Sequence, residues 1–112
     1  MCDCAADIGV LVHLEFIPMT AIPDVATAWR IVRDAGRPNG GILFDTWHFS
    51  RGSADFDDLQ TVPAERILAV QVDDAATEVS GSLWDDTQRR LLPDDGIVWH
   101  ILDETQAVMG DG

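Results

Sequence analysis

Three short apolar segments, separated by stretches long enough to form a helix, constrain the fold of this chain more than any other feature. They are residues 10–17, 41–49 and 67–74. Segments this apolar are typical of strands that are buried on both faces of a parallel sheet. Parallel strands need a connection of about a dozen residues or more between them. The order of the segments therefore predicts βα units and an α/β fold with parallel strands.

The connecting stretches carry helix and turn signals. Residues 24–35 place apolar side chains on one helical face, and Gly36 follows as a C-terminal stop. Residues 55–60 predict a short helix or turn before the third strand. Residues 75–96 are polar and predict a long loop, after which residues 97–109 predict a final helix.

Each predicted strand carries polar side chains at or near its end. These are Glu15 on the first strand, Asp45 and His48 on the second, and Gln71 and Asp74 on the third. Because the catalytic groups of (β/α) barrels sit where strands end and loops begin, we expect these side chains to converge. A carboxylate among apolar neighbours is costly to bury unless it is paired or binds a cation. Carboxylate, imidazole and amide donors together predict a divalent metal site.

Each candidate ligand also has a plainer interpretation. Glu15 can begin a solvated loop, and Gln71 can bond only to the backbone. Asp45 can be a helix cap, with His48 packed on Trp47. We favour the ligand interpretation for Glu15 and Asp45 because a barrel brings the ends of its strands together.

Asp74 closes the third segment, and two arginines, Arg89 and Arg90, stand further along the chain. Arg90 is expected to clamp an anionic or polyhydroxylated substrate, whereas Arg89 is expected at the surface. Asp74 fits a loop cap, a group that supports the metal ligands, and a direct ligand about equally well.

The length of the chain limits the architecture. Its 112 residues match one domain, but a complete eight-stranded barrel takes about 250 residues. Either a smaller α/β fold or a part of a barrel is therefore expected.

The charge balance excludes one class of partner. The chain has 20 acidic and 7 basic residues, a formal charge of −13. A surface of this sign repels phosphate backbones, so we expect no nucleic-acid partner. Most of the acidic excess is expected to be solvated surface: Asp55, Asp57, Asp58, Asp85, Asp86, Asp94, Asp95, Asp103 and Glu104.

The location follows from what the sequence lacks. No apolar stretch approaches the ~20 residues of a membrane span, so we expect no membrane partner. The first residues carry neither the basic nor the apolar segment of a secretory signal, so a cytoplasmic location is expected. Cys2 and Cys4 have no second Cys or His pair nearby and are expected to be free thiols.

An ordered set of motifs resembles one known family, the sugar phosphate isomerases and epimerases of the xylose isomerase-like TIM barrels. The motifs are Leu14-Glu15-Phe16, Phe44-Asp45-Thr46-Trp47-His48, Val70-Gln71-Val72-Asp73-Asp74 and Arg90-Leu91-Leu92-Pro93-Asp94-Asp95-Gly96. The resemblance covers nearly the whole chain. It implies a partial (β/α)8 TIM barrel, about strands five to seven with the helices that follow, so that residues 1–112 are a fragment of one barrel domain.

The resemblance also implies roles for individual residues. It places a divalent metal, manganese, cobalt, magnesium or zinc, on Glu15 and Asp45. Gln71 stands where the family usually has a histidine ligand. It assigns substrate binding to His48 and Arg90. In the loop that follows Arg90, Asp94 replaces the first glycine of the family pattern.

The reaction implied by the resemblance is proton transfer on a hydroxy-ketone sugar or sugar phosphate, through an enediolate that a divalent cation stabilises. Glu15 would be one of the two acid/base groups. The second belongs to strand eight, and the chain stops at Gly112 before that strand is expected, so we expect little turnover from this chain alone.

Other functions stay open. The same barrel supports dehydration of inositol-derived ketones, as in an inosose dehydratase, and also phosphodiester cleavage, against which the acidic surface argues. A non-catalytic fragment is a further alternative. With its strand edges unpaired it would dock on a complementary half-barrel or form a homo-oligomer.

Overall fold

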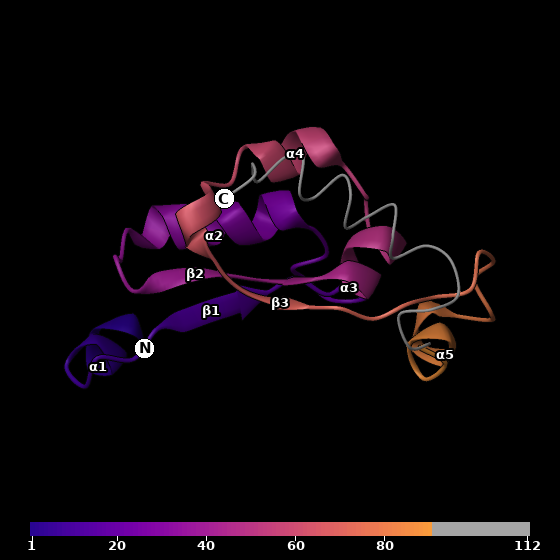
Figure 1. Ribbon diagram of the computed structural model, residues 1–112, viewed down its shortest axis with the longest axis horizontal. Coiled ribbons are helices and arrows are strands. Elements are labelled where there is room, and N and C mark those ends of the chain that lie inside the picture. Colours follow the sequence, from indigo (N-terminus) through magenta and orange to yellow (C-terminus); the bar gives the residue numbers. More distant parts are fainter. Residues whose placement is uncertain (91–112) are drawn as a thin grey trace.

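The computed structural model describes residues 1–90, and in them three parallel strands form one sheet (Figure 1). The strands are β1 (Val12–Glu15), β2 (Gly40–Asp45) and β3 (Ile67–Gln71), in the spatial order β1-β2-β3. Both pairings are parallel. The predicted α/β fold with consecutive parallel strands is confirmed for this part of the chain.

The crossover between β1 and β2 is the predicted helix α2 (Val25–Ala35). Asp24 caps it by accepting a hydrogen bond from the Thr27 N–H at 2.8 Å. Gly36 ends it with φ of 63°, a left-handed conformation that glycine adopts at little cost. Sequence signals alone therefore identified both ends of this helix correctly.

Two short helical segments connect β2 to β3. The helix α4 (Phe56–Gln60) begins after Asp55, whose side chain accepts from two backbone N–H groups of the first turn. The 3-10 turn η1 (Ala64–Arg66) then leads into β3. The short helix predicted at residues 55–60 is thus present.

The helices α2 and α4 lie over the same face of the sheet (Figure 1). The apolar core lies between these helices and the sheet. Its buried members are Phe16, Val25, Ala28, Ile42, Phe44, Phe49, Leu59 and Val62. Because strand residues alternate between faces, Ile42 and Phe44 point to this core. Leu43 and Asp45 point to the opposite face.

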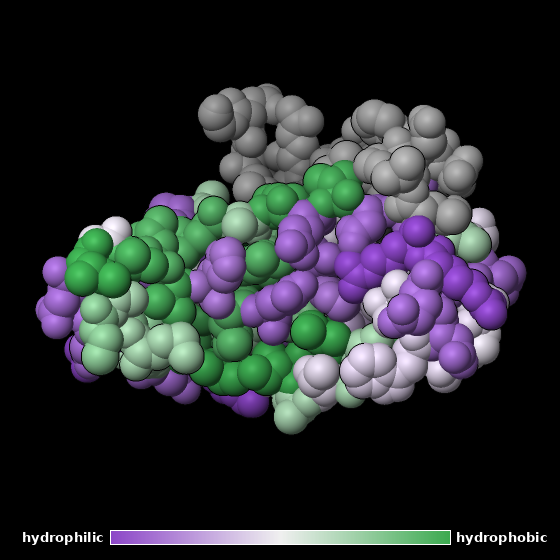
Figure 2. All heavy atoms as spheres, turned by 90° about the horizontal axis from the view of Figure 1, so that it is seen from below, coloured by the Kyte–Doolittle hydropathy of each residue, from purple (hydrophilic) through white to green (hydrophobic). Residues whose placement is uncertain are grey.

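That opposite face carries the candidate ligands. Glu15 pairs in register with Leu43, and Asp45 pairs with Gln71, so Glu15, Asp45 and Gln71 share one face of the sheet. Seen from this side, a hydrophobic area passes into a strongly hydrophilic one (Figure 2). Within residues 1–90, the outer edges of β1 and β3 have no neighbouring strand.

Gly41 permits a close approach between β2 and β3. A Cβ atom at this position would lie 2.5 Å from both the Arg66 carbonyl oxygen and Leu68 Cγ. The register of the two strands shifts directly after it, between Ile42 and Leu43. A residue without a side chain therefore allows β3 to run beside β2 up to Asp45.

The second strand was expected to end at Asp45, and it does. The helix α3 (Thr46–Arg51) begins at once, because Asp45 caps it. One prediction for the chain after β3 is wrong. Residues 75–96 were expected to be a loop, yet they contain α5 (Leu83–Thr87). Ser82 and Asp85 form a reciprocal capping box at its start, which stabilises this short helix.

The remaining elements complete the description. A short helix that the pattern did not predict, α1 (Cys2–Ala6), precedes β1, and both cysteines are free. Within the described residues, no helix is long and apolar enough to span a bilayer. The helix predicted at residues 97–109 and the substitution at Asp94 lie outside the described residues.

Candidate metal centre

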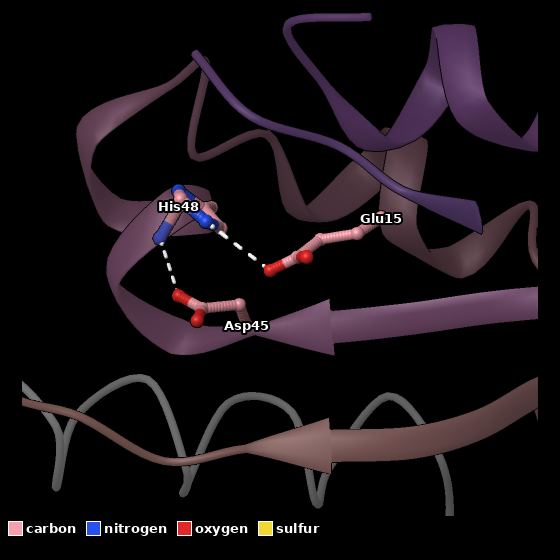
Figure 3. A group of neighbouring side chains, drawn as sticks. All are labelled: Glu15, Asp45 and His48. Carbon is pink, nitrogen blue, oxygen red and sulfur yellow. Dashed lines mark hydrogen bonds and ion pairs between the residues drawn. The ribbon is translucent and has the colours of Figure 1, made fainter. Parts of the chain in front are cut away.

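Three side chains converge at the carboxyl ends of the first two strands (Figure 3). Glu15 is the last residue of β1, Asp45 is the last residue of β2, and His48 lies in the first turn of α3. One potential donor atom from each lies within 4.8 Å of the other two. The convergence predicted for Glu15, Asp45 and His48 from the strand ends is therefore present in the structure.

Asp45 serves two purposes at once. Its Oδ1 accepts a hydrogen bond from the His48 N–H at 2.8 Å and so caps α3. Its Oδ2 points elsewhere and accepts from an arginine. The residue is fully buried, so both oxygens depend on protein partners or a cation. The helix-cap interpretation and the ligand interpretation are thus compatible, because each uses a different oxygen.

The helix that Asp45 caps places His48 beside Glu15. His48 Nε2 lies 3.2 Å from Glu15 Oε1. Glu15 keeps 32% of its side chain exposed, whereas His48 keeps 5%. The His48 ring also packs edge-on against Trp47, as the alternative interpretation expected, with ring centroids 5.4 Å apart. Glu15 therefore lies at the open side of the cluster and His48 at its closed side.

Arg90 completes the cluster. Its Nη1 donates to Asp45 Oδ2 at 3.1 Å, and its Nη2 lies 3.2 Å from His48 Nε2. The same Nη1 pairs with Asp73. The guanidinium carbon lies 4.8 Å from the centroid of a Trp47 ring. Arg90 therefore contacts the cluster, whereas Arg89 is exposed and bonds to Ser80.

The cluster is electrostatically incomplete. The carboxylates of Glu15, Asp45 and Asp73 face one guanidinium, which leaves a formal charge of −2 when His48 is neutral. Burial lowers the pKa of His48 and the Arg90 charge adds to that effect, while Asp45, Glu15 and Asp73 oppose it. The net effect is that the pKa of His48 is below its usual value, so its ring is neutral near pH 7.

Within residues 1–90, two neighbouring ring nitrogens at the cluster are without a hydrogen-bond partner. Among the described residues, His48 Nδ1 and Trp47 Nε1 are buried and have no hydrogen-bond partner. Buried polar groups of this kind are uncommon and occur often at functional sites.

The donor set fits a divalent cation. Two carboxylates and a neutral imidazole are ligands for zinc, manganese or cobalt, and the carboxylates also suit magnesium. The formal charge of −2 matches such an ion. We conclude that Glu15, Asp45 and His48 form a candidate metal centre, with Arg90 against two of its members.

Within the described residues, Asp74 is not one of the converging carboxylate and imidazole donors, and Gln71 lies on the neighbouring strand. Gln71 is the last residue of β3, opposite Asp45 in the pairing, and its side chain is exposed. Its register places it at the correct edge of the sheet for the role expected of it. Asp74 is buried, and its Oδ1 accepts from the Ala75 N–H at 2.7 Å, as a loop cap does.

Asp73, for which no role of its own was predicted from the sequence, pairs with Arg90. One acidic residue was misjudged from the sequence. Asp86 was expected to be solvated surface, but it is 4% exposed and forms an ion pair with Arg51 at 2.7 Å. The signal that distinguishes Asp73 is its neighbourhood: Thr46 Oγ1 donates to its carbonyl oxygen and accepts from its N–H. This pair of bonds orients the loop after β3.

Comparisons with known proteins show which family the chain is similar to. The family described as xylose isomerase-like TIM barrel matches residues 1–105. Proteins named inosose isomerase are similar over 98 residues: 30% identical in Bacillus velezensis, 31% in Halalkalibacterium halodurans and 28% in Bacillus subtilis. Each match covers 86% of this chain and 34% of the relative. The chain thus spans about a third of the length of these curated relatives.

Solved structures show the same partial barrel. The IOLI protein with a bound zinc atom superposes with a TM-score of 0.80 at 24% identity, over 98% of this chain and 40% of that one. A xylose isomerase domain protein from Alicyclobacillus acidocaldarius superposes with a TM-score of 0.66 at 25% identity, over 93% of this chain and 40% of that one. The three parallel strands of this chain therefore match part of a TIM barrel, as the motifs implied.

Proposed function

The chain belongs to the xylose isomerase-like TIM barrel family, and from that membership we propose that it forms part of a metal-dependent sugar or sugar phosphate isomerase or epimerase. The observation that carries this proposal is the cluster of Glu15, Asp45 and His48, whose donor atoms lie within 4.8 Å of one another. They stand at the strand ends where barrels of this kind place their chemistry.

The residues divide the work according to their surroundings. Asp45, fully buried, supplies a fixed negative charge for the cation and orients α3. Glu15 is the most exposed of the three and is the group that removes a proton from the carbon beside the carbonyl. A divalent cation, when bound, supplies Lewis-acid polarisation of that carbonyl. His48 and Gln71 are the two candidates for a further donor to the cation, and His48 is also placed to bond a substrate hydroxyl.

The substrate class follows from the charge and from the relatives. Arg90 offers a guanidinium to an anionic or polyhydroxylated group. Relatives named inosose isomerase favour a polyhydroxylated ring ketone over an open-chain sugar. Because the chain spans about a third of those relatives, the activity is proposed for a complete barrel, of which residues 1–90 contribute three strands.

Two alternatives use the same residues. A lyase would remove a hydroxyl group from an inosose instead of moving a proton back to carbon, and product analysis separates it from an isomerase. A non-catalytic half-barrel would use the open edges of β1 and β3 to bind a complementary half. Its binding would not depend on a metal.

The first experiment measures divalent metal binding by calorimetry with Mn²⁺ and Zn²⁺ on the 112-residue chain. Asp45→Asn should abolish a one-to-one site, because it removes a buried charge and keeps the helix cap. Asp55→Asn is the matched control, since Asp55 also caps a helix but lies exposed and apart from the cluster. Equal binding by both variants would contradict the proposal.

The second experiment measures turnover of an inosose in the presence of Mn²⁺. Any isomerisation by the chain, alone or with a complementary barrel fragment, should be lost in Glu15→Gln. Turnover that survives this substitution would show that Glu15 is not the acid/base group. Loss of water from the substrate would favour the lyase.

A further inference from the structure

The position of the Arg90 guanidinium has a consequence for metal binding. It bridges Asp45 Oδ2 and His48 Nε2, at 3.1 and 3.2 Å. Asp45 Oδ1 is engaged by the His48 N–H, so Oδ2 is the oxygen of this buried carboxylate that remains for a cation. His48 Nε2 is also the ring nitrogen that faces Glu15. Arg90 thus holds the atoms that a divalent ion needs.

We propose that Arg90 and the divalent cation compete for these atoms, so that Arg90 closes the metal centre and leaves it when the metal enters. This inference rests on the proposed function, because it takes the cluster as a metal site. The acceptor nitrogen of an imidazole has a single lone pair, so His48 Nε2 can serve either the guanidinium or the ion. At Asp45 Oδ2, two cations at contact distance repel each other.

The structure provides alternative partners for the displaced guanidinium. Asp73 pairs with Arg90 without belonging to the three-residue cluster. The Trp47 ring offers a cation–π contact, and Thr87 Oγ1 accepts from Arg90 Nε at 3.1 Å. Arg90 keeps 28% of its side chain exposed, which leaves it room to turn. These contacts retain Arg90 at the edge of the centre while Asp45 Oδ2 and His48 Nε2 become free.

The consequence is an order of events. Before the metal binds, the guanidinium is occupied by Asp45 and unavailable to an anionic or hydroxyl-rich substrate. After the metal binds, the same guanidinium stays at the edge of the centre beside Asp73 and Thr87 and is no longer occupied by Asp45. Metal entry therefore prepares the substrate-binding arginine.

The test measures Zn²⁺ affinity by calorimetry in the full 112-residue chain. Arg90→Gln should bind Zn²⁺ at least about tenfold more tightly than the wild type, because the competing charge-assisted contacts are gone. Arg89→Gln is the matched control. It removes the same charge one residue away, from an exposed side chain that bonds to Ser80, and should change the affinity by less than about twofold.

A third variant separates direct competition from the loss of a nearby charge. Arg90→Lys keeps the charge, but a single ammonium group cannot bridge Asp45 and His48 as the planar guanidinium does. Under direct competition its Zn²⁺ affinity falls between those of the wild type and Arg90→Gln. An affinity equal to that of the wild type would overturn the proposal in favour of repulsion at a distance.

Nuclear magnetic resonance gives a readout that does not depend on affinity. The Nε–Hε signal of Arg90, assigned through Arg90→Gln, should move with one equivalent of Zn²⁺ while that of Arg89 stays. Zn²⁺ binding that leaves the Arg90 signal unchanged would overturn the proposal. Absence of Zn²⁺ binding in every variant would overturn the proposed metal centre and this inference together, whereas binding with equal affinity in Arg90→Gln and Arg89→Gln would overturn the inference alone.

Discussion

Two buried aspartate–arginine pairs flank α3, and they differ in how completely their polar atoms are satisfied. Asp86 accepts from Arg51 at 2.7 Å and from the Ser80 N–H at 3.0 Å, and Arg51 donates to the Ala76 carbonyl at 2.6 Å. Both side chains are about 5% exposed. Asp45 and Arg90 form the second pair, beside two further carboxylates and a histidine nitrogen without a partner.

The difference separates a structural pair from a ligand site. The Arg51–Asp86 pair matches one charge with one charge, so it needs nothing else and holds the loop after β3 and α5 against α3. The Asp45–Arg90 pair has excess negative charge, and its arginine keeps 28% of its side chain exposed. We call Arg51–Asp86 the closed pair and Asp45–Arg90 the open pair. The closed pair contributes to folding, whereas the open pair can still bind a ligand.

The largest expected effect comes from breaking the closed pair. Arg51→Gln or Asp86→Asn should lower the free energy of unfolding by on the order of 3 kcal/mol, since the remaining charge is buried alone. Urea denaturation measures it. The double variant Arg51→Met with Asp86→Leu should recover part of the loss, and single variants with wild-type stability would refute the structural role.

The open pair should respond to metal instead. Zn²⁺ at about a hundred times its dissociation constant should raise the free energy of unfolding by about 2.7 kcal/mol, and EDTA should reverse this. Asp45→Asn should lose the increase and change the metal-free stability little, because asparagine still caps α3. A stabilisation by Zn²⁺ that survives in Asp45→Asn would place the metal elsewhere.

The sheet beneath the open pair can be strained without touching either pair. Gly41→Ala should cost about 1–3 kcal/mol in thermal or urea unfolding, because its Cβ would collide with Arg66 and Leu68. Gly40→Ala is the control, as its Cβ would meet only ordinary contacts, the nearest at 3.5 Å. Similar stability of the two variants would show that β2 and β3 are not as close as described.

The smallest effect is the pH dependence of the closed pair. Burial raises the pKa of Asp86, but hydrogen bonds from the Ser80 N–H and Arg51, with the charges of Arg51 and Arg89, outweigh it and lower the pKa. A carboxyl whose pKa is lowered by folding stabilises the protein above its unfolded pKa and loses this as the pH falls through the folded value. Stability should therefore decline below about pH 4, the ordinary range of aspartate. Asp86→Asn should flatten that decline in acid-unfolding curves.

Much of the fold could be predicted from local signals. The apolar segments indicated three parallel strands, and Asp24 with Gly36 marked the ends of α2. The strand-end rule brought Glu15, Asp45 and His48 together, and Asp55 marked the start of α4. The end of the second strand at Asp45 was also predicted, and the same residue caps α3.

The pairings of the two arginines could not be predicted in the same way. Arg51 meets Asp86 across 35 positions, and Arg90 meets Asp45 across 45. Several acidic residues stand near each partner in the sequence, as Asp73 beside Asp74 and Asp85 beside Asp86 illustrate. Only the path of the loop after β3 decides which carboxylate of each two meets an arginine.

By itself, therefore, the sequence of this protein determined the order of strands and helices, the positions of most caps and the strand ends at which polar side chains gather. Those features depend on periodicity and on contacts within a few residues. The tertiary structure decided which arginine closes which aspartate, and hence which pair is saturated and which is left open. That choice depends on strand register and on burial, where an unmatched charge costs far more than it does in water.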